Sequence, residues 1–502
     1  MDDKPLVAYG LTSLQKKRYR ASLTIIKSIL VSFLLMLIVP MVNGSFLYYF
    51  DTGSYLASGE AVGKRILPDS SSVLPSSSTV QRRVESQHAP LSPDSKIIRS
   101  ERSFYYGIPL NIVNRLGGIR LVILLQITIV AIILSMFVRS LGSAELGQQN
   151  LTSALTIAIT PVAVFSIVAI PDLFAGTGLA ACAVLLTFNG RLGRNDQAFW
   201  YLVLIVSILM HNAIALTLTA LAASWPIIAR ATTGRWSPKA WKTFAITLAS
   251  LVVLQLTPLS IRAAMHAVDT TPPFLLGRLI GDGTAEKVLK RDCGVTHWET
   301  CTVLPYLPVT ENDFLWGGNV HRESLFLGYN KMPVPRQLKI KQESFEIIKR
   351  TVFRFGGEQI LKSLQNGVRQ FFNLSLDEFV QNNNVIEQGN KILGPQAISL
   401  QHSAVRKNPE ILEWLTILYT SSFIIALIIL LRYAYHMRGV VDEANPLMMI
   451  GVCLFVGVAI NALVCGGAAG VFGRYEARIV WPIVAVAIYL ILERGPYRRT
   501  RQ

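Results

Sequence analysis

Charged residues are scarce in this chain of 502 residues: Asp, Glu, Lys and Arg make up only 16% of it, whereas 51% of its residues are hydrophobic. The mean hydropathy of +0.42 is too high for a soluble protein of this size. The composition therefore excludes a soluble protein and predicts an α-helical polytopic membrane protein.

Acidic residues are fewer than basic ones, 31 against 48, so the formal net charge is +17. A basic cytoplasmic face on anionic lipid accounts for this excess, and we expect no nucleic acid partner. A Gly-rich phosphate-binding loop is also missing from the segments that we expect in the cytoplasm. The use of nucleotide sugars or ATP is therefore not expected.

Long apolar runs predict about ten transmembrane helices, because a hydrocarbon core of roughly 30 Å requires about 20 helical residues per crossing. The stretch 197–229 could form one long kinked helix, but the basic tract after it would then lie outside, so we expect two short helices. The predicted crossings are 22–43, 119–139, 151–171, 175–190, 197–210, 213–229, 244–264, 412–432, 447–466 and 476–492.

Lys and Arg in the short connections place both chain ends in the cytoplasm, since positively charged loops are retained there. We expect the first apolar run to be retained, because it is longer than the apolar core of a typical signal peptide. Two long segments are then exported, and the first of them carries a Ser/Pro-rich insert. The predicted divisions are a basic N-terminus (1–21), the first helix (22–43), the first exported segment (44–118), helices two to seven (119–264), a mostly helical exported domain (265–411), helices eight to ten (412–492) and a basic tail (493–502).

Cysteine is rare, with five residues in the chain, and three of them fall in or beside predicted membrane helices. Cys293 and Cys301 lie eight positions apart in the predicted exported domain. In an oxidising compartment this spacing favours a local disulfide. His297 lies between them, but two cysteines and one histidine without a fourth nearby ligand make a poor zinc site.

The stretch "FDTGSYLASGE" places Asp51, and further along Glu60, just after the first predicted helix. A carboxylate at the outer mouth of a membrane helix stays ionised and is close to lipid head groups. Asp51 is therefore a candidate general base or cation ligand for an enzyme that acts on a lipid phosphate. The alternative is that Asp51 only terminates the helix in an Asp-Gly turn.

The last predicted outer loop, "GVFGRYEARIVW", places Arg474 and Arg478 four residues apart on one helical face, with Tyr475 between them. Guanidinium groups in this arrangement can hold a phosphate or diphosphate through paired hydrogen bonds. The alternative is that both arginines are interfacial anchors that extend toward the head groups.

Further candidate substrate-binding residues are Arg102, Tyr105 and Tyr106 in "RSFYYGIPL", and His211 with Asn212 in "ILMHNAIAL". The tyrosines also fit the aromatic belt of a membrane protein. The polar pair at 211 and 212 either forms the outer turn between two helices or opens into the same cavity as Asp51.

These features together resemble the membrane glycosyltransferases of the C-type fold (GT-C), which use polyprenyl-phosphate sugars. The resemblance rests on the acidic residue after the first helix, the aromatic-Gly-Pro stretch "SFYYGIPL" and the late "RYEAR" segment. It implies a catalytic or metal-linked role for Asp51, phosphate binding by Arg474 with Tyr475, and room for a divalent cation as cofactor. The acidic motif here is a single Asp followed by Thr-Gly rather than a pair of carboxylates.

The exported stretch that begins "FLLGRLIGDGTAEKVLKRDCGVTHWETC" also resembles a set of uncharacterised proteobacterial inner-membrane proteins. This likeness implies a bacterial inner (plasma) membrane location with large periplasmic segments, and it implies no function.

Three function classes follow. The first is a glycosyltransferase that moves a sugar from a lipid-linked donor to a glycan, lipid or protein acceptor on the outer face. The second is a polysaccharide polymerase or ligase, which uses undecaprenyl-diphosphate-linked glycans and needs no Asp base. The third is a transporter, but the chain shows no internal symmetry of the kind that transporters have.

Overall fold

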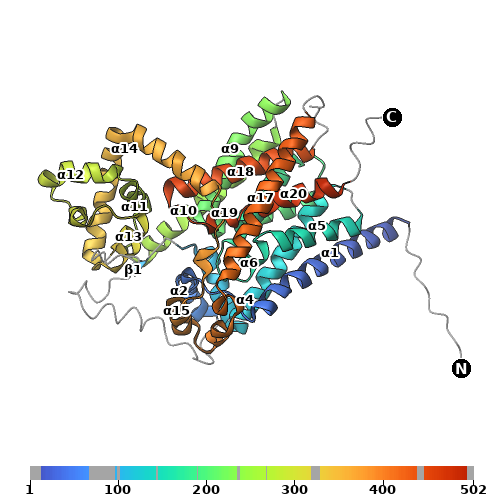
Figure 1. Cartoon of the computed structure of the whole chain (residues 1–502), viewed down its shortest axis with the longest axis horizontal. Helices are drawn as coiled ribbons and strands as arrows, with labels where there is room; N and C mark the ends of the chain where they lie inside the picture. Colours follow the sequence, from blue (N-terminus) through green and yellow to red (C-terminus); the bar gives the residue numbers. More distant parts are fainter. Residues whose placement is uncertain are drawn as a thin grey trace.

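The computed structural model describes residues 13–66, 97–98, 102–142, 145–188, 190–234, 238–266, 268–317, 328–437 and 446–493. The described chain consists almost entirely of helices. Long apolar helices form a bundle, and a smaller group of helices lies beside one end of it (Figure 1). The Ser/Pro-rich insert and most of both basic termini lie outside the described residues.

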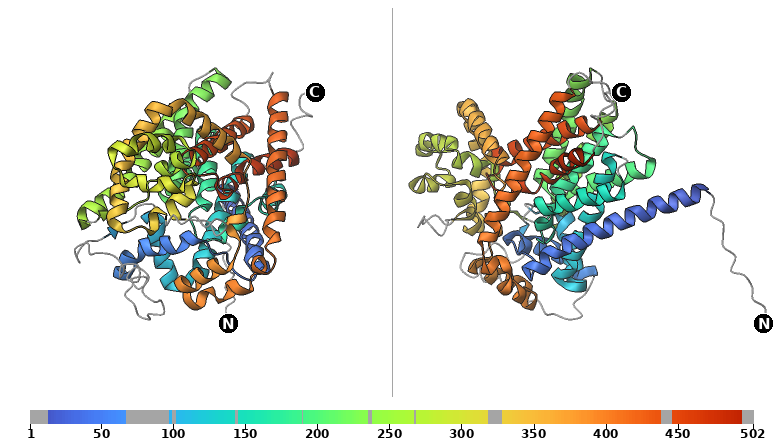
Figure 2. Two further views of the ribbon diagram at one scale, coloured as in Figure 1. Left: turned by 60° about the vertical axis from the view of Figure 1, so that its left-hand side comes forward. Right: turned by 45° about the vertical axis from the view of Figure 1, so that its right-hand side comes forward.

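Six of the described helices are long and apolar enough to cross a membrane, so the protein is embedded in a membrane. Two of them, α1 and α10, are mostly exposed: only 17% of the residues in the apolar 18-residue stretch of each helix are buried. Figure 2 shows α1 extending from the bundle toward the N-terminus. The six are α1 (Ser13–Asn43), α4 (Phe104–Leu141), α9 (Asn212–Thr233), α10 (Pro238–Met265), α17 (Glu410–His436) and α18 (Pro446–Ala468).

Four shorter helices overlap the remaining predicted crossings. At 1.5 Å per residue the longest of them reaches only about 26 Å, which is less than the hydrocarbon core, so a count of ten crossings stays a prediction. These helices are α5 (Leu146–Ile159), α7 (Leu173–Thr187), α8 (Arg194–Met210) and α20 (Trp481–Leu492). The prediction of one crossing at 151–171 is wrong, because α5 ends at Ile159, Thr160 has an extended backbone and the five-residue helix α6 (Val162–Ser166) follows.

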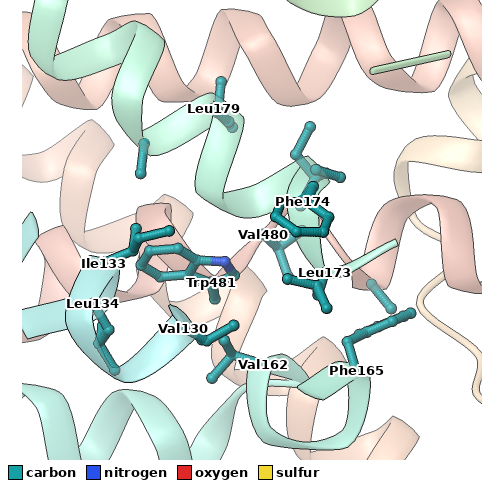
Figure 3. Packing of buried hydrophobic residues seen from close by; sticks show 14 of the residues in the cluster. Val130, Ile133, Leu134, Val162, Phe165, Leu173, Phe174, Leu179, Val480 and Trp481 are labelled. Atoms are coloured by element: carbon teal, nitrogen blue, oxygen red, sulfur yellow. The ribbon is translucent and has the colours of Figure 1, made fainter. Parts of the chain in front are cut away.

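The start of α7 and the start of α20 meet in the core of the bundle. Trp481 packs edge-to-face on Phe137 with ring centroids 5.6 Å apart, and Leu173 and Phe174 lie close to it (Figure 3). Gly176 permits this contact, because a Cβ atom there would lie 2.0 Å from the indole nitrogen of Trp481. Close packing thus fixes the start of α20 against that of α7.

Two breaks in the helices fall where the sequence predicts boundaries. His211 separates α8 from α9 and has an extended backbone, and its Nδ1 accepts a hydrogen bond from the Ala213 amide at 3.1 Å. The stretch 197–229 therefore forms two helices. Inside α4, Gly117 and Gly118 leave helical geometry, with φ of +73° at Gly118. This break separates the predicted first exported segment from the second predicted crossing.

The bundle end that carries the described parts of 44–118 and 265–411, which the sequence predicts to be exported, is called the outer end below. Helix α2 (Phe50–Ile66) packs there on the first part of α4. The two backbones touch at Gly59, where a Cβ atom would lie 2.1 Å from the Gly107 carbonyl oxygen. Strand β1 (Ile97–Ile98) pairs in parallel with β2 (Val268–Asp269), which joins the two predicted exported segments.

The smaller group of helices has its own core, which includes Phe314, Ile340 and Ile347. A disulfide joins Cys293 in α12 to Cys301 in η1. The group consists of α11 (Phe274–Gly281), α12 (Thr284–Thr296), η1 (Glu299–Tyr306), α13 (Glu311–Trp316), η2 (Tyr329–Lys331) and the first part of α14 (Val334–Phe371).

The remaining described elements are short and lie mostly at the outer end. They are α6 (Val162–Ser166), η3 (Asp377–Phe379), α15 (Asn383–Leu393), η4 (Gly394–His402), α16 (Ala404–Lys407) and α19 (Arg474–Ala477).

Candidate functional site

The loop that joins α18 to α20 carries the two arginines predicted to bind phosphate. Gln370 at the end of α14 holds this loop: its side-chain nitrogen donates to the Phe472 carbonyl, and its oxygen accepts from the Phe472 amide, both at 2.9 Å. Gly473 lies against the backbone of Ser375, where a Cβ atom would be 2.1 Å from the carbonyl oxygen. The position of Arg474 is therefore set by contacts with the end of α14 and with the backbone that follows it.

Arg474 lies among three carboxylates from distant parts of the chain. Its Nη1 is 3.5 Å from Asp51 Oδ2 and 3.3 Å from Asp172 Oδ2, and its Nε is 3.0 Å from Glu378 Oε2. The guanidinium also lies over the rings of Tyr49 and Tyr475, at 4.4 and 4.9 Å from their centroids. A planar group with several donors suits this position better than an ammonium would.

Two further arginines complete the arrangement. Arg478 forms an ion pair with Asp172, and the two side chains are 0% and 2% exposed. Arg102 forms an ion pair with Asp51. We call Asp51, Arg102, Asp172, Glu378, Arg474 and Arg478 the charged cluster. Its three positive and three negative groups balance, as burial in a low-dielectric environment requires.

A pocket of about 110 Å³ opens beside the charged cluster. Asp51, Arg102 and Arg474 contribute to its wall from the bundle, and Glu311 and Trp316 contribute from α13. The pocket therefore lies between the membrane helices and the smaller group of helices. We call it the site pocket.

Comparison of the chain with models of known protein families, with curated proteins and with solved structures found no match.

A second pocket of about 170 Å³ adjoins the first, with Arg102 in the wall of both. Tyr105 and Asn212 line it together with residues of α10. The Tyr105 hydroxyl is 2.7 Å from Thr257 Oγ1, and Gln255 donates to the Asn212 side-chain oxygen at 3.0 Å. The structure thus brings Arg102, Tyr105 and Asn212 together, in a pocket beside that of Asp51.

Three other predicted residues lie elsewhere around the cluster. His211 caps α9 with its side chain and lines neither of the two pockets. Tyr106 is buried and packs edge-to-face on Tyr55 at 5.1 Å, as a core side chain would. Glu60 lies about two and a half turns beyond Asp51 on α2 and is not among the residues that line either pocket.

Sequence reasoning missed two members of the charged cluster. Asp172 could have been found from the sequence. It is a carboxylate in the apolar stretch "AIPDLF", and ionisable residues at membrane depth are rarely without a role. Glu378 could not have been found in this way, since it is one of many acidic residues in the predicted exported domain. In the structure, burial raises the pKa of Glu378, although Arg474 and a hydrogen bond from the Tyr49 hydroxyl at 3.0 Å oppose this change.

The partners of Asp51 decide what the site can bind. They are guanidinium groups rather than further carboxylates. Within the described ranges, no group of three or more His, Cys, Asp or Glu side chains is placed to hold a metal ion. The described residues therefore offer anion-binding chemistry at this position: converging arginines beside a carboxylate and a tyrosine hydroxyl.

Proposed function

We propose that the protein is a membrane glycosyltransferase that moves a sugar from a polyprenyl-phosphate donor to a glycan, lipid or protein acceptor at the outer face of the bacterial inner membrane. The supporting observation is that Asp51 and Arg474, 423 positions apart in the chain, meet in one pocket at the outer end of the bundle. A candidate base and a candidate phosphate ligand are thus adjacent.

The position of the charged cluster along α18 supports a lipid-linked donor. Asp172 immediately precedes α7, and Arg478 lies three positions before α20, which has 12 residues. Asn461 of α18 donates to the Tyr475 carbonyl and to Glu476, and it lies seven positions, or about 10 Å of helix, before the outer end of α18 at Ala468. The charged cluster is then at a depth that a lipid phosphate group reaches without leaving the membrane.

An incoming phosphate would compete with Asp51 for its two arginine partners. It presents several acceptor oxygens and negative charge to Arg102 and Arg474, which now bind the carboxylate. This exchange releases Asp51 only when donor is bound. Asp51 can then accept the proton of the acceptor hydroxyl, while the arginines stabilise the charge that develops on the leaving phosphate.

One observation favours a polymerase or ligase as the second candidate. Asp51 is held by two guanidinium groups and is not free to accept a proton in this arrangement. A diphosphate is a good leaving group and needs no such base. In that enzyme Asp51 would position Arg102 and Arg474, and these two arginines of the site pocket would bind the diphosphate.

The test is whether the protein recognises the phosphate of a polyprenyl lipid. Thermal unfolding of the purified protein is followed while undecaprenyl phosphate, undecaprenyl diphosphate or undecaprenol is added. Binding to the folded state alone stabilises it by about 2.7 kcal/mol at a hundredfold excess over the dissociation constant. We expect stabilisation by undecaprenyl phosphate and little by the alcohol; stronger stabilisation by the diphosphate would favour the second candidate.

Two matched variants test whether stabilisation by undecaprenyl phosphate depends on the charged cluster. Arg474→Lys should weaken the response to the phosphate, whereas Arg336→Lys should not, because Arg336 pairs with Glu299 on the smaller group of helices. Equal stabilisation by the alcohol and by both phosphorylated lipids would contradict both candidate functions.

A further inference from the structure

The second half of α14 buries three amide side chains and exposes most of its apolar side chains, together with Gln365 and Arg369. A break at Phe355, with φ of −127° and ψ of 22°, divides the helix. Beyond the break, Gln359, Asn366 and Gln370 are buried, at 8%, 5% and 0% exposure. On the opposite side lies an apolar stripe whose members are 50–63% exposed: Ile360, Leu361, Leu364, Val368 and Phe372.

The first half of the same helix is mixed: Gln337 and Thr351 are buried there, and Phe345, Val352 and Phe353 are exposed. Ile340 and Ile347 are fully buried in the core of the smaller group of helices. Exposed apolar side chains thus occur on both sides of the break at Phe355, and the second half differs in the helices that it contacts.

The buried polar face is fully engaged. Gln359 and Asn366 both donate to the carboxylate of Asp282, at 2.8 and 2.9 Å. Asp282 also pairs with Arg278, which reaches Glu311 in the wall of the site pocket at 3.0 Å. The polar side chains therefore point inward because they have partners there. The apolar stripe faces away from the protein and is exposed to its surroundings.

The end of α14 lies beside the middle of two membrane-spanning helices. Gly367 is in contact with Leu463 of α18, and the Phe371 ring is 5.6 Å from Phe423 of α17 and 6.0 Å from Phe455 of α18. Phe455 is separated from the outer end of α18 by about 20 Å of helix, at 1.5 Å per residue. Figure 1 shows α14 leading from the smaller group of helices to α18.

We propose that residues 356–372 form a re-entrant membrane segment, which enters the bilayer from the outer end and presents its apolar stripe to lipid acyl chains. The stripe continues the lipid-facing surface of α18, where Phe455 and Leu463 are each 45% exposed. The chain then continues through 373–377 to Glu378 in the charged cluster. This inference is independent of the proposed function, because it rests only on burial and on the contacts with α17 and α18.

The proposed re-entrant segment also contacts the charged cluster through the loop that carries Arg474. Gln370 lies on the buried face of the segment. It forms two hydrogen bonds with Phe472 in the loop that joins α18 to α20 and carries Arg474 and Arg478. Contact between lipid and the apolar stripe would therefore help to hold α14 in place, and through Gln370 the loop that positions Arg474.

Fluorescence quenching tests the surroundings of the stripe. Leu364→Cys and Val368→Cys are each labelled with bimane and reconstituted into phosphatidylcholine vesicles, with or without bromine on the acyl chains. The control is Val295→Cys on α12, an apolar side chain that is 83% exposed on the smaller group of helices. Cys182, Cys453 and Cys465 are buried, and the native chain taken through the same labelling is the blank.

We expect brominated lipid to quench bimane at 364 and 368 but not at 295. Aqueous iodide should quench bimane at 295 several-fold more strongly than at the other two positions. Equal iodide quenching at all three positions, without quenching by bromine, would overturn the proposal. Protection of 364 and 368 from both quenchers would also overturn it, because a protein partner rather than lipid would then cover the stripe.

Discussion

Replacing Arg474 by lysine keeps the positive charge but removes the planar group that now reaches three carboxylates at 3.0–3.5 Å. One ammonium cannot make all of these contacts and also bind a phosphate through paired hydrogen bonds. Loss of one hydrogen bond between charged groups costs about 1.5–3 kcal/mol. At about 1.4 kcal/mol per factor of ten, sugar transfer should fall by roughly ten- to a hundredfold.

Asp51→Asn separates the two candidate enzymes. It removes the charge and keeps the shape, and loss of a general base should lower the transfer rate by at least about a hundredfold. A polymerase or ligase with a diphosphate leaving group should tolerate this change and still fail with Arg474→Lys. A protein that is purely structural has no reason to be sensitive to either change.

The assay is transfer of labelled sugar from a polyprenyl-phosphate donor in membrane vesicles that contain equal amounts of each variant, together with the surface-glycan profile of the cells. Arg336→Lys makes the same chemical change at an ion pair outside the charged cluster, and it should leave transfer unchanged. Normal amounts of the Asp51→Asn and Arg474→Lys proteins with an unaltered glycan profile would refute the enzymatic interpretation.

Three further predictions concern the smaller group of helices and the orientation of the chain. Thiol labelling of the intact protein should miss Cys293 and Cys301 until a reductant is added, because they are disulfide-bonded, and labelling before reduction would contradict this. Hydrogen bonds from two arginines lower the pKa of Asp292. Its contribution to stability should be complete above the ordinary aspartate pKa of about 4 and lost as the pH falls through the lower folded value, a loss that unfolding curves of Asp292→Asn should not show. A reporter active only outside the cytoplasm should work after Pro308 and one active only inside after Arg235, and a reversed result would refute the predicted orientation.

Local properties of the chain predicted much of the fold. Hydropathy is a sum over neighbouring residues, so it identified the membrane-embedded class and the positions of the long apolar helices. The helix breaks at His211 and at Gly117–Gly118 also follow from nearby residues, because a polar pair and a glycine pair interrupt apolar runs. Hydropathy does not single out the second half of α14, where buried amides and exposed Gln365 and Arg369 alternate with apolar side chains.

The sequence alone determined that this is a helical membrane protein with a carboxylate near one end and arginines near the other, because each of these facts depends only on residues close together in the chain. Only the tertiary structure decided that Asp51 is paired with Arg102 and Arg474, and that Asp172 and Glu378 join them. Ion pairs between positions 51 to 423 residues apart depend on how the helices pack, and burial then requires that every charge find a partner.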